Sequence, residues 1–107
     1  METPVTARAA LLQVLLEGPG YGLELADRVF ARTNGGILIR QGSLYPALQQ
    51  FTDKGLVSAS ERPAPTTAHS RTYYKLTKKG MAEAQRLRGL MSSLMAGPQD
   101  TSVEISA

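Results

Sequence analysis

The chain has 107 residues, 12 of them Lys or Arg and 9 Asp or Glu, for a formal net charge of +3, and it contains no cysteine. This length allows one domain with a modest core. Without cysteine there are no disulfides and no thiolate metal sites, which is typical of a reducing cytoplasm. No apolar run is long enough to cross a bilayer, and residues 1–4 lack the basic segment of a secretory signal, so we expect no membrane partner.

The first expected helix covers 5–17, where apolar residues recur at spacings of three and four. Leu12 and Leu16 widen its apolar stripe beyond what one contact surface needs, so we expect a second apolar partner, such as another subunit. The second expected helix covers 21–32, with Tyr21, Leu25, Val29 and Phe30 turned inward.

After the second helix, Asn34-Gly35-Gly36 predicts a stop, because these residues tolerate left-handed backbone. The short β-branched segment 37–39 predicts a minimal strand.

The third expected helix runs to about Lys54 and turns Leu44, Ala47, Leu48 and Phe51 inward. Its other face is uncharged over its first turns and rich in hydrogen-bonding side chains, and it is flanked by Arg40 and Lys54. One interpretation is an ordinary solvated face; the other is a face that enters a DNA groove. Pro46 fits a helix only near its start, so we expect free backbone N–H groups close to Ser43 and Tyr45.

Two strands are expected at 56–61 and 71–76, joined by a tip with two prolines. Alternation places one of Tyr73 and Tyr74 in the core, and we favour Tyr74. The basic residues of this region meet no acid between 62 and 79; they are Arg62, Arg71, Lys75, Lys78 and Lys79. Such a patch indicates a polyanion partner, although it is also common on proteins that bind none.

The order of elements predicts a mainly α fold with a small β-hairpin, a winged helix-turn-helix that spans 1–76. Thr77 is a good N-cap for a last helix over 77–96, in which apolar residues follow the rhythm of a packed helix pair. This helix either folds back onto its own core or joins two subunits; the number of its apolar residues favours a C-terminal dimerisation helix. Residues 97–107 are polar and are expected to form a disordered tail.

Four segments in order are similar to one family: 17–25, 42–48 (Gly-Ser-Leu-Tyr-Pro-Ala-Leu), 54–57 and 71–80. On these the chain resembles the PadR-like transcriptional regulators, in the short branch with a single C-terminal helix. The resemblance implies homodimers that bind DNA, usually as repressors of nearby promoters, with the last helix in the dimer interface. Phe51 and Thr52 depart from the family pattern, and the hairpin tip is longer than expected.

The candidate DNA-binding residues are of two kinds. Arg40, Lys54 and the hairpin cations are expected to meet phosphates or the minor groove, whereas side-chain amides suit adenine. His69 has no carboxylate partner nearby and is expected to be a loop residue near phosphate rather than a metal ligand. The full DNA-binding set is Arg40, Gln41, Ser43, Tyr45, Gln49, Gln50, Lys54, Arg62, His69, Arg71, Tyr73 and Lys75. The expected dimer interface comprises Leu12, Leu16, Ala84, Leu87, Leu90, Met91, Leu94 and Met95.

The expected partners are a second copy of the chain and double-stranded DNA carrying a pseudo-palindromic operator. Two rival functions are a winged-helix module that binds only protein and a small enzyme. The enzyme is disfavoured because the sequence offers no nucleophile–base set, no carboxylate pair on one face and no metal-ligand spacing. No cofactor is expected. The resemblance also implies, for some members, release from DNA by a small aromatic or drug-like ligand, which this sequence does not identify.

Overall fold

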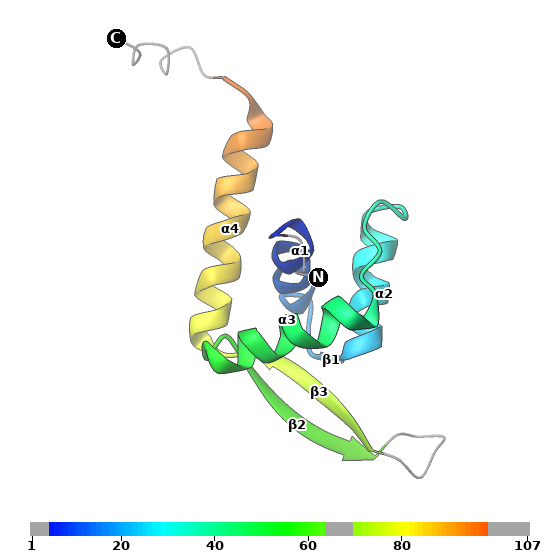
Figure 1. Cartoon of the computed structure of the whole chain (residues 1–107). Coiled ribbons are helices and arrows are strands. Elements are labelled where there is room, and N and C mark those ends of the chain that lie inside the picture. The colour runs from blue at the N-terminus through cyan, green and yellow to red at the C-terminus, as the bar shows by residue number, and fades with distance from the viewer. Residues whose placement is uncertain (1–4, 64–69, 99–107) are drawn as a thin grey trace.

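The computed structural model describes residues 5–63 and 70–98, which form four helices and a three-stranded antiparallel sheet (Figure 1). None of the helices in these two ranges is long and apolar enough to span a membrane. The elements in chain order are α1 (Val5–Leu15), β1 (Gly20–Tyr21), α2 (Gly22–Arg32), α3 (Gln41–Asp53), β2 (Val57–Pro63), β3 (Ser70–Leu76) and α4 (Lys78–Ala96). The predicted helix-rich fold with a hairpin is confirmed.

One apolar core joins the first three helices to the base of the hairpin. Its largest fully buried side chains are Leu11, Leu25, Val29, Leu44 and Leu48. Burying such a side chain stabilises the fold by about 1.5–3 kcal/mol. The predicted inward stripe of α3 is confirmed, so its opposite face must point to solvent.

The sheet has β3 at its centre, paired with β2 on one side and with β1 on the other. The third strand is thus Gly20–Tyr21, and the prediction of a strand at 37–39 was wrong. Ile39 is buried and Ile37 packs against the core, so their β-branched side chains serve packing rather than strand pairing.

Two aromatic side chains that were expected to point inward from the second helix are not buried in the core. Tyr21 belongs to β1 and is the N-cap of α2, with its side chain half-buried. Phe30 is 45% exposed, with its ring next to Gly35. Asn34 and Gly35 both have positive φ and end the helix as predicted.

Pro46 is the sixth residue of α3, so the expectation that it lies near the start of the helix was wrong. Because proline has no N–H, the carbonyl of Gly42 lacks its helical donor. The helix ends at Asp53, and Gly55 follows with φ of +74°.

The two halves of α4 have different surroundings. The first half and the middle contact α1: the Gln13 side chain of α1 donates to the Ala84 carbonyl at 2.7 Å and accepts from Arg88 at 3.1 Å. The second half rises beyond the other helices (Figure 1). The first half of α4 therefore packs back onto the core of its own chain, whereas the second half is an exposed apolar helix.

Leu12 does not need the second apolar partner that was expected for it. Its side chain is only 4% exposed because the core of its own chain covers it, and Ala84 is likewise buried. Both are corrections to the expected dimer interface, since a covered side chain offers no surface to another subunit.

Thr77 connects the segment after α3, the base of the hairpin and the start of α4 by hydrogen bonds. Its N–H donates to the Leu56 carbonyl at 3.0 Å and its hydroxyl donates to the Gly55 carbonyl at 2.6 Å. The same hydroxyl accepts from the Gly80 N–H at 3.0 Å, which confirms the predicted N-cap. Lys79 adds a bond to the Lys54 carbonyl at 2.9 Å. We call 54–56 and 77–80 together the hairpin junction.

Gly80 packs directly against the junction backbone, so Gly80→Ala should destabilise the protein. The added methyl would clash with the Leu56 carbonyl oxygen, and overpacking of this kind costs about 1–3 kcal/mol. Gly89→Ala is the matched control, because Gly89 is exposed on the same helix and a Cβ added there would meet no atom within 4 Å. It should gain up to about 1 kcal/mol. Urea unfolding at equal protein concentration compares the two, and equal stabilities would contradict the junction packing.

Candidate nucleic-acid interface

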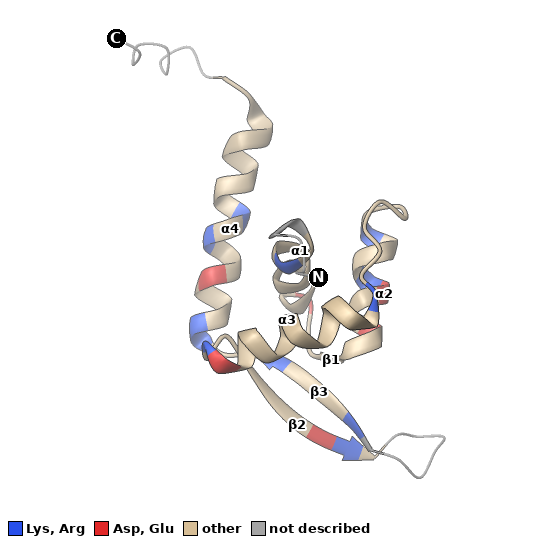
Figure 2. Ribbon diagram, in the orientation of Figure 1, with Lys and Arg blue, Asp and Glu red and all other residues tan. Residues whose placement is uncertain are grey.

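The solvent face of α3 carries almost no charge. Figure 2 shows the helix uncharged along its length except at its last residue, Asp53. Gln41, Tyr45, Gln49 and Gln50 are exposed, and Ser43 is half-buried. The exposed cations Arg40 and Lys54 stand immediately before and after the helix. The structure thus places amide and hydroxyl groups between two positive ends.

The backbone at the start of α3 differs from the prediction. The N–H groups of Ser43 and Leu44 both donate to the Arg40 carbonyl, each at 2.9 Å. The Ser43 amide is therefore used within the first turn, so the expectation that it is free for a phosphate was wrong.

Gln49 is already engaged on the helix surface. Its Nε2 donates to Oδ1 of Asp53 one turn later at 2.9 Å. Since both groups are exposed, exchanging this bond for one to a base edge costs little.

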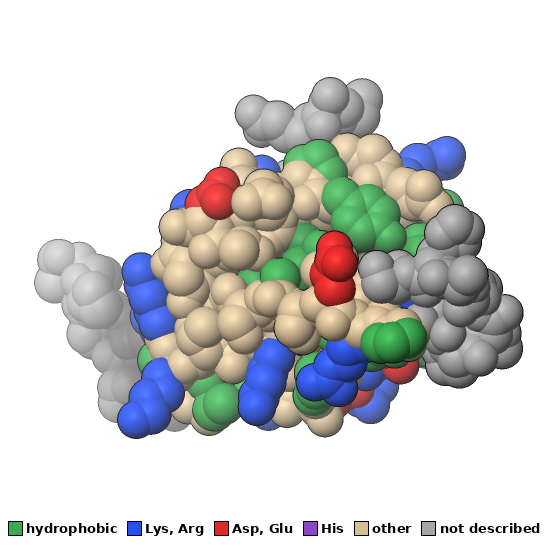
Figure 3. Space-filling model, turned by 90° about the horizontal axis from the view of Figure 1, so that it is seen from below, with side chains coloured by type: hydrophobic (Ala, Val, Ile, Leu, Met, Phe, Trp, Pro, Cys, Tyr) green, Lys and Arg blue, Asp and Glu red, His purple; other side chains and the backbone are tan. Residues whose placement is uncertain are grey.

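The hairpin has one face that is positively charged. The cross-strand partners Ser58–Lys75, Ser60–Tyr73 and Arg62–Arg71 share this face, which we call the outer face. Glu61 is paired with Thr72 and belongs to the other face. The ion pairs Arg28–Glu24, Arg32–Glu17 and Arg86–Glu83 lie elsewhere in the described part of the chain. Figure 3 shows Lys and Arg side chains gathered along the edges of the surface seen from below.

Both arginines of the outer face lie over tyrosine rings. The guanidinium carbon of Arg71 is 4.2 Å from the ring centre of Tyr21, and that of Arg62 is 5.5 Å from the ring centre of Tyr73. The two rings meet edge to face, with centres 5.6 Å apart at 73°. We call these four side chains the arginine–tyrosine ladder.

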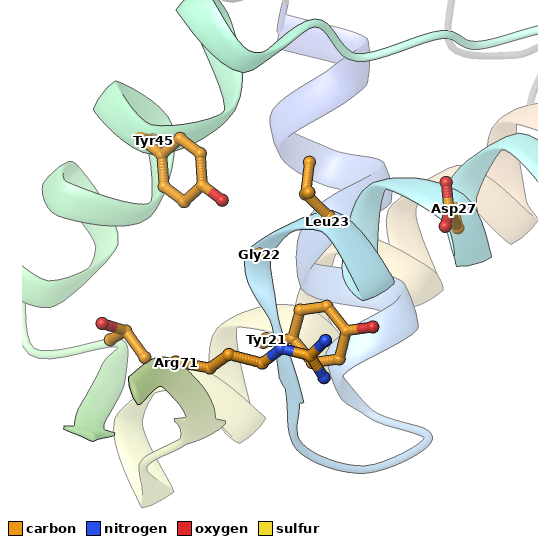
Figure 4. Close-up of a pocket in the computed structure, with 7 residues that line it drawn as sticks. Tyr21, Gly22, Leu23, Asp27, Tyr45 and Arg71 are labelled. Carbon is orange, nitrogen blue, oxygen red and sulfur yellow. The ribbon is translucent and has the colours of Figure 1, made fainter. Parts of the chain in front are cut away.

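A cleft of about 480 Å³ opens between the start of α2, α3 and the hairpin (Figure 4). Tyr45 borders it from α3, and Arg71 lies across Tyr21 on the opposite side. The Tyr45 ring lies close to the backbone of Gly22. Only glycine permits this approach, because a Cβ at this position would lie 2.7 Å from the ring. Asp27 is the one acid in the lining, which comprises Tyr21, Gly22, Leu23, Asp27, Tyr45, Arg71 and Thr72.

The two adjacent tyrosines of β3 point to opposite sides, as alternation predicted. Tyr74 packs against the apolar core, and Tyr73 belongs to the outer face. Burial raises the pKa of the Tyr74 hydroxyl, and the nearby Tyr45 phenolate adds to the effect. The preference for Tyr74 as the core residue is confirmed.

Two expectations fall partly or wholly outside the described residues. His69 lies outside them, as does most of the predicted tail. Within the described ranges, no group of three or more His, Cys, Asp or Glu side chains is placed to hold a metal.

A comparison with models of known protein families gives a match over most of the chain. Residues 11–86 match the model of the "Transcriptional regulator PadR-like family". The chain belongs to this family. The prediction of a transcriptional regulator rather than an enzyme is therefore confirmed.

Other PadR-like regulators share the fold at low sequence identity. A PadR-like transcription factor from Bacteroides fragilis is 22% identical, with a TM-score of 0.72, and the match covers 95% of this chain and 90% of that one. Bacillus subtilis PadR, solved in complex with operator DNA, is 20% identical with a TM-score of 0.68 over 78% of this chain and 46% of that one.

A curated relative gives no further function. An uncharacterized protein from Lysinibacillus sphaericus is 29% identical over 77 residues, which cover 72% of this chain and 70% of that one.

The exposed end of α4 in this PadR-like chain is strongly apolar. Leu94 and Met95 are each 79% exposed, and Leu90 and Met91 are also exposed, whereas Leu16 and Leu87 are partly buried against the core. Large apolar side chains grouped in this way usually mark an interaction surface.

Sequence patterns missed the part played by Tyr21. Its position before an amphipathic helix suggested an inward residue, but the pairing of β1 with β3 brings its ring against Arg71. A two-residue strand leaves no periodic signal, so only the tertiary structure reveals this contact.

The raised pKa of Tyr74 predicts how stability changes at high pH. A hydroxyl whose pKa is higher in the folded than in the unfolded state stabilises the fold below the unfolded pKa of about 10, and this contribution is lost as pH rises through the folded pKa. Tyr74→Phe should therefore lose less stability than the parent protein between about pH 9 and 11. Urea unfolding across this range tests the prediction, with Tyr73→Phe as the control. An unchanged slope in Tyr74→Phe would contradict the assignment.

Proposed function

We propose that this PadR-like regulator is a homodimeric repressor that binds double-stranded DNA sequence-specifically at nearby promoters in the cytoplasm. The observation that carries the proposal is the uncharged face of α3, bordered by the cleft with Arg71 and by the basic outer face of the hairpin. An uncharged face of amides and hydroxyls suits base edges, and surrounding cations suit phosphates.

The division of contacts follows from where the side chains lie. Gln49 and Gln50 are exposed on α3, where their amides are suited to adenine in the major groove. Tyr45 and Arg71 border the cleft between α3 and the hairpin, where a phosphate of the same duplex would fit. Arg62 and Lys75 extend the positive surface along the hairpin. Bacillus subtilis PadR, which shares this fold, was solved in complex with operator DNA, and this supports DNA binding in the proposal.

The dimer in this proposal forms through α4. The exposed apolar residues Leu90, Met91, Leu94 and Met95 would be covered by a second copy. Met91 also borders an apolar hollow of about 220 Å³ between α1 and the end of α2, large enough to receive a partner side chain. Release from DNA by a small ligand is the part of the proposal that rests on family resemblance alone.

Selection of genomic fragments on the immobilised protein, followed by sequencing, tests sequence-specific DNA binding. We expect enrichment of a pseudo-palindrome whose half-sites are separated by about one helical turn, roughly 34–36 Å. Enrichment of no sequence, together with no retardation of any fragment at low salt, would instead favour a winged-helix module that binds only protein.

Leu94→Glu should break the dimer without unfolding the protomer. Its side chain is already solvent-exposed within one chain, so a carboxylate there harms only a contact with another copy. Ser93→Glu is the matched control, because a neighbouring helical residue points in a different direction. Sedimentation equilibrium measures both. A parent protein that is monomeric at micromolar concentration, or a dimer unaffected by Leu94→Glu, would contradict the interface.

A further inference from the structure

Arg62 and Arg71 face each other as direct cross-strand partners near the tip of the hairpin. Like charges in this position repel and destabilise a strand pair. The ion pairs Arg28–Glu24, Arg32–Glu17 and Arg86–Glu83 involve neither of them. The directions of both guanidinium groups are constrained by other contacts.

The tyrosine rings supply that constraint. A cation over an aromatic ring within about 6 Å of its centre is attracted to the ring face. Arg71 is held 4.2 Å from the Tyr21 ring centre, while Arg62 is held over the other ring, that of Tyr73. The two cations are thus drawn to separate rings, and the edge-to-face contact of those rings fixes their spacing.

Tyr21 holds its place from the body of the domain rather than from the hairpin. It pairs with Tyr73 through β1, and its N–H donates to the Glu24 side chain in the first turn of α2 at 3.3 Å. Figure 4 shows Arg71 lying across this ring, on the border of the cleft that Tyr45 bounds from α3. The ring therefore orients a hairpin cation relative to the start of α2 and to α3.

We propose that Tyr21 is a positioning residue for DNA binding: its ring holds the Arg71 guanidinium at the cleft beside α3, ready for a backbone phosphate. An arginine that is ordered before binding loses less conformational freedom when it meets a phosphate. This inference rests on the proposed function, since it assumes that the cleft receives DNA.

A double-mutant cycle tests the role of Tyr21 on the full chain. The affinity of the parent protein, Tyr21→Leu, Tyr21→Phe, Arg71→Ala and the Tyr21→Leu/Arg71→Ala double variant is measured by fluorescence anisotropy, on a selected fragment at several salt concentrations. Arg71→Ala should weaken binding and reduce the salt slope by about one. Tyr21→Leu should weaken binding about two- to tenfold, because Arg71 must then be ordered during binding. Tyr21→Phe keeps the ring and should bind like the parent.

The decisive comparison is the effect of Tyr21→Leu when Arg71 is already absent. If Tyr21 acts through Arg71, the leucine substitution has no further effect in the Arg71→Ala background. Equal losses in both backgrounds, or a parent-like affinity for Tyr21→Leu, would overturn the proposal. A parent protein that binds no DNA would instead overturn the proposed function, so the two failures are distinct.

Discussion

The hydrogen bonds of Thr77 fix the geometry on which the rest of the molecule depends. One residue bonds to the backbone after α3, to the start of the hairpin and to the first turn of α4. Gly80 lets α4 approach the Leu56 carbonyl closely enough for these bonds to form. These bonds therefore fix the relative orientation of three elements that meet at the hairpin junction. They are α3 with its uncharged face, the basic hairpin, and α4 with its apolar end.

The hairpin is held at a second place as well, by the short strand β1. Its pairing with β3 anchors the middle of the hairpin to the start of α2, and the arginine–tyrosine ladder extends this anchor toward the tip. A hairpin attached only at its base would swing relative to α3. Attached at two places, it presents its cations at a fixed distance from the helix whose amides face solvent.

Much of this arrangement could be predicted from the sequence because it depends on periodicity. The apolar spacing of Leu44, Ala47, Leu48 and Phe51 predicts the buried side of α3, and alternation around Tyr74 predicts the core side of β3. Features without a period could not be found in this way. The two-residue strand at Tyr21 and the mid-helix position of Pro46 depend on tertiary packing, which overrides local preference.

The same limit applies to the candidate interfaces. The apolar excess of α1 and α4 is visible in the sequence, but which residues their own chain covers is not. Leu12 and Ala84 fill the protomer core, whereas Leu94 and Met95 remain in solvent. Likewise, the sequence shows that the hairpin is basic, but not that Arg62 and Arg71 stand opposite each other over two rings.

We propose that pairing through α4 sets the distance between the two α3 helices of the dimer, because the hairpin junction connects α3 to α4 within each protomer. The chain has no cysteine, so Gln50→Cys gives one spin-label position, exposed on α3. Double electron–electron resonance on the DNA-free protein then measures the distance between the labels of the two copies. We expect a single narrow distribution near one turn of DNA, about 34–36 Å after allowance for the label arms. No dipolar coupling, or a separation that B-form DNA cannot match, would contradict it.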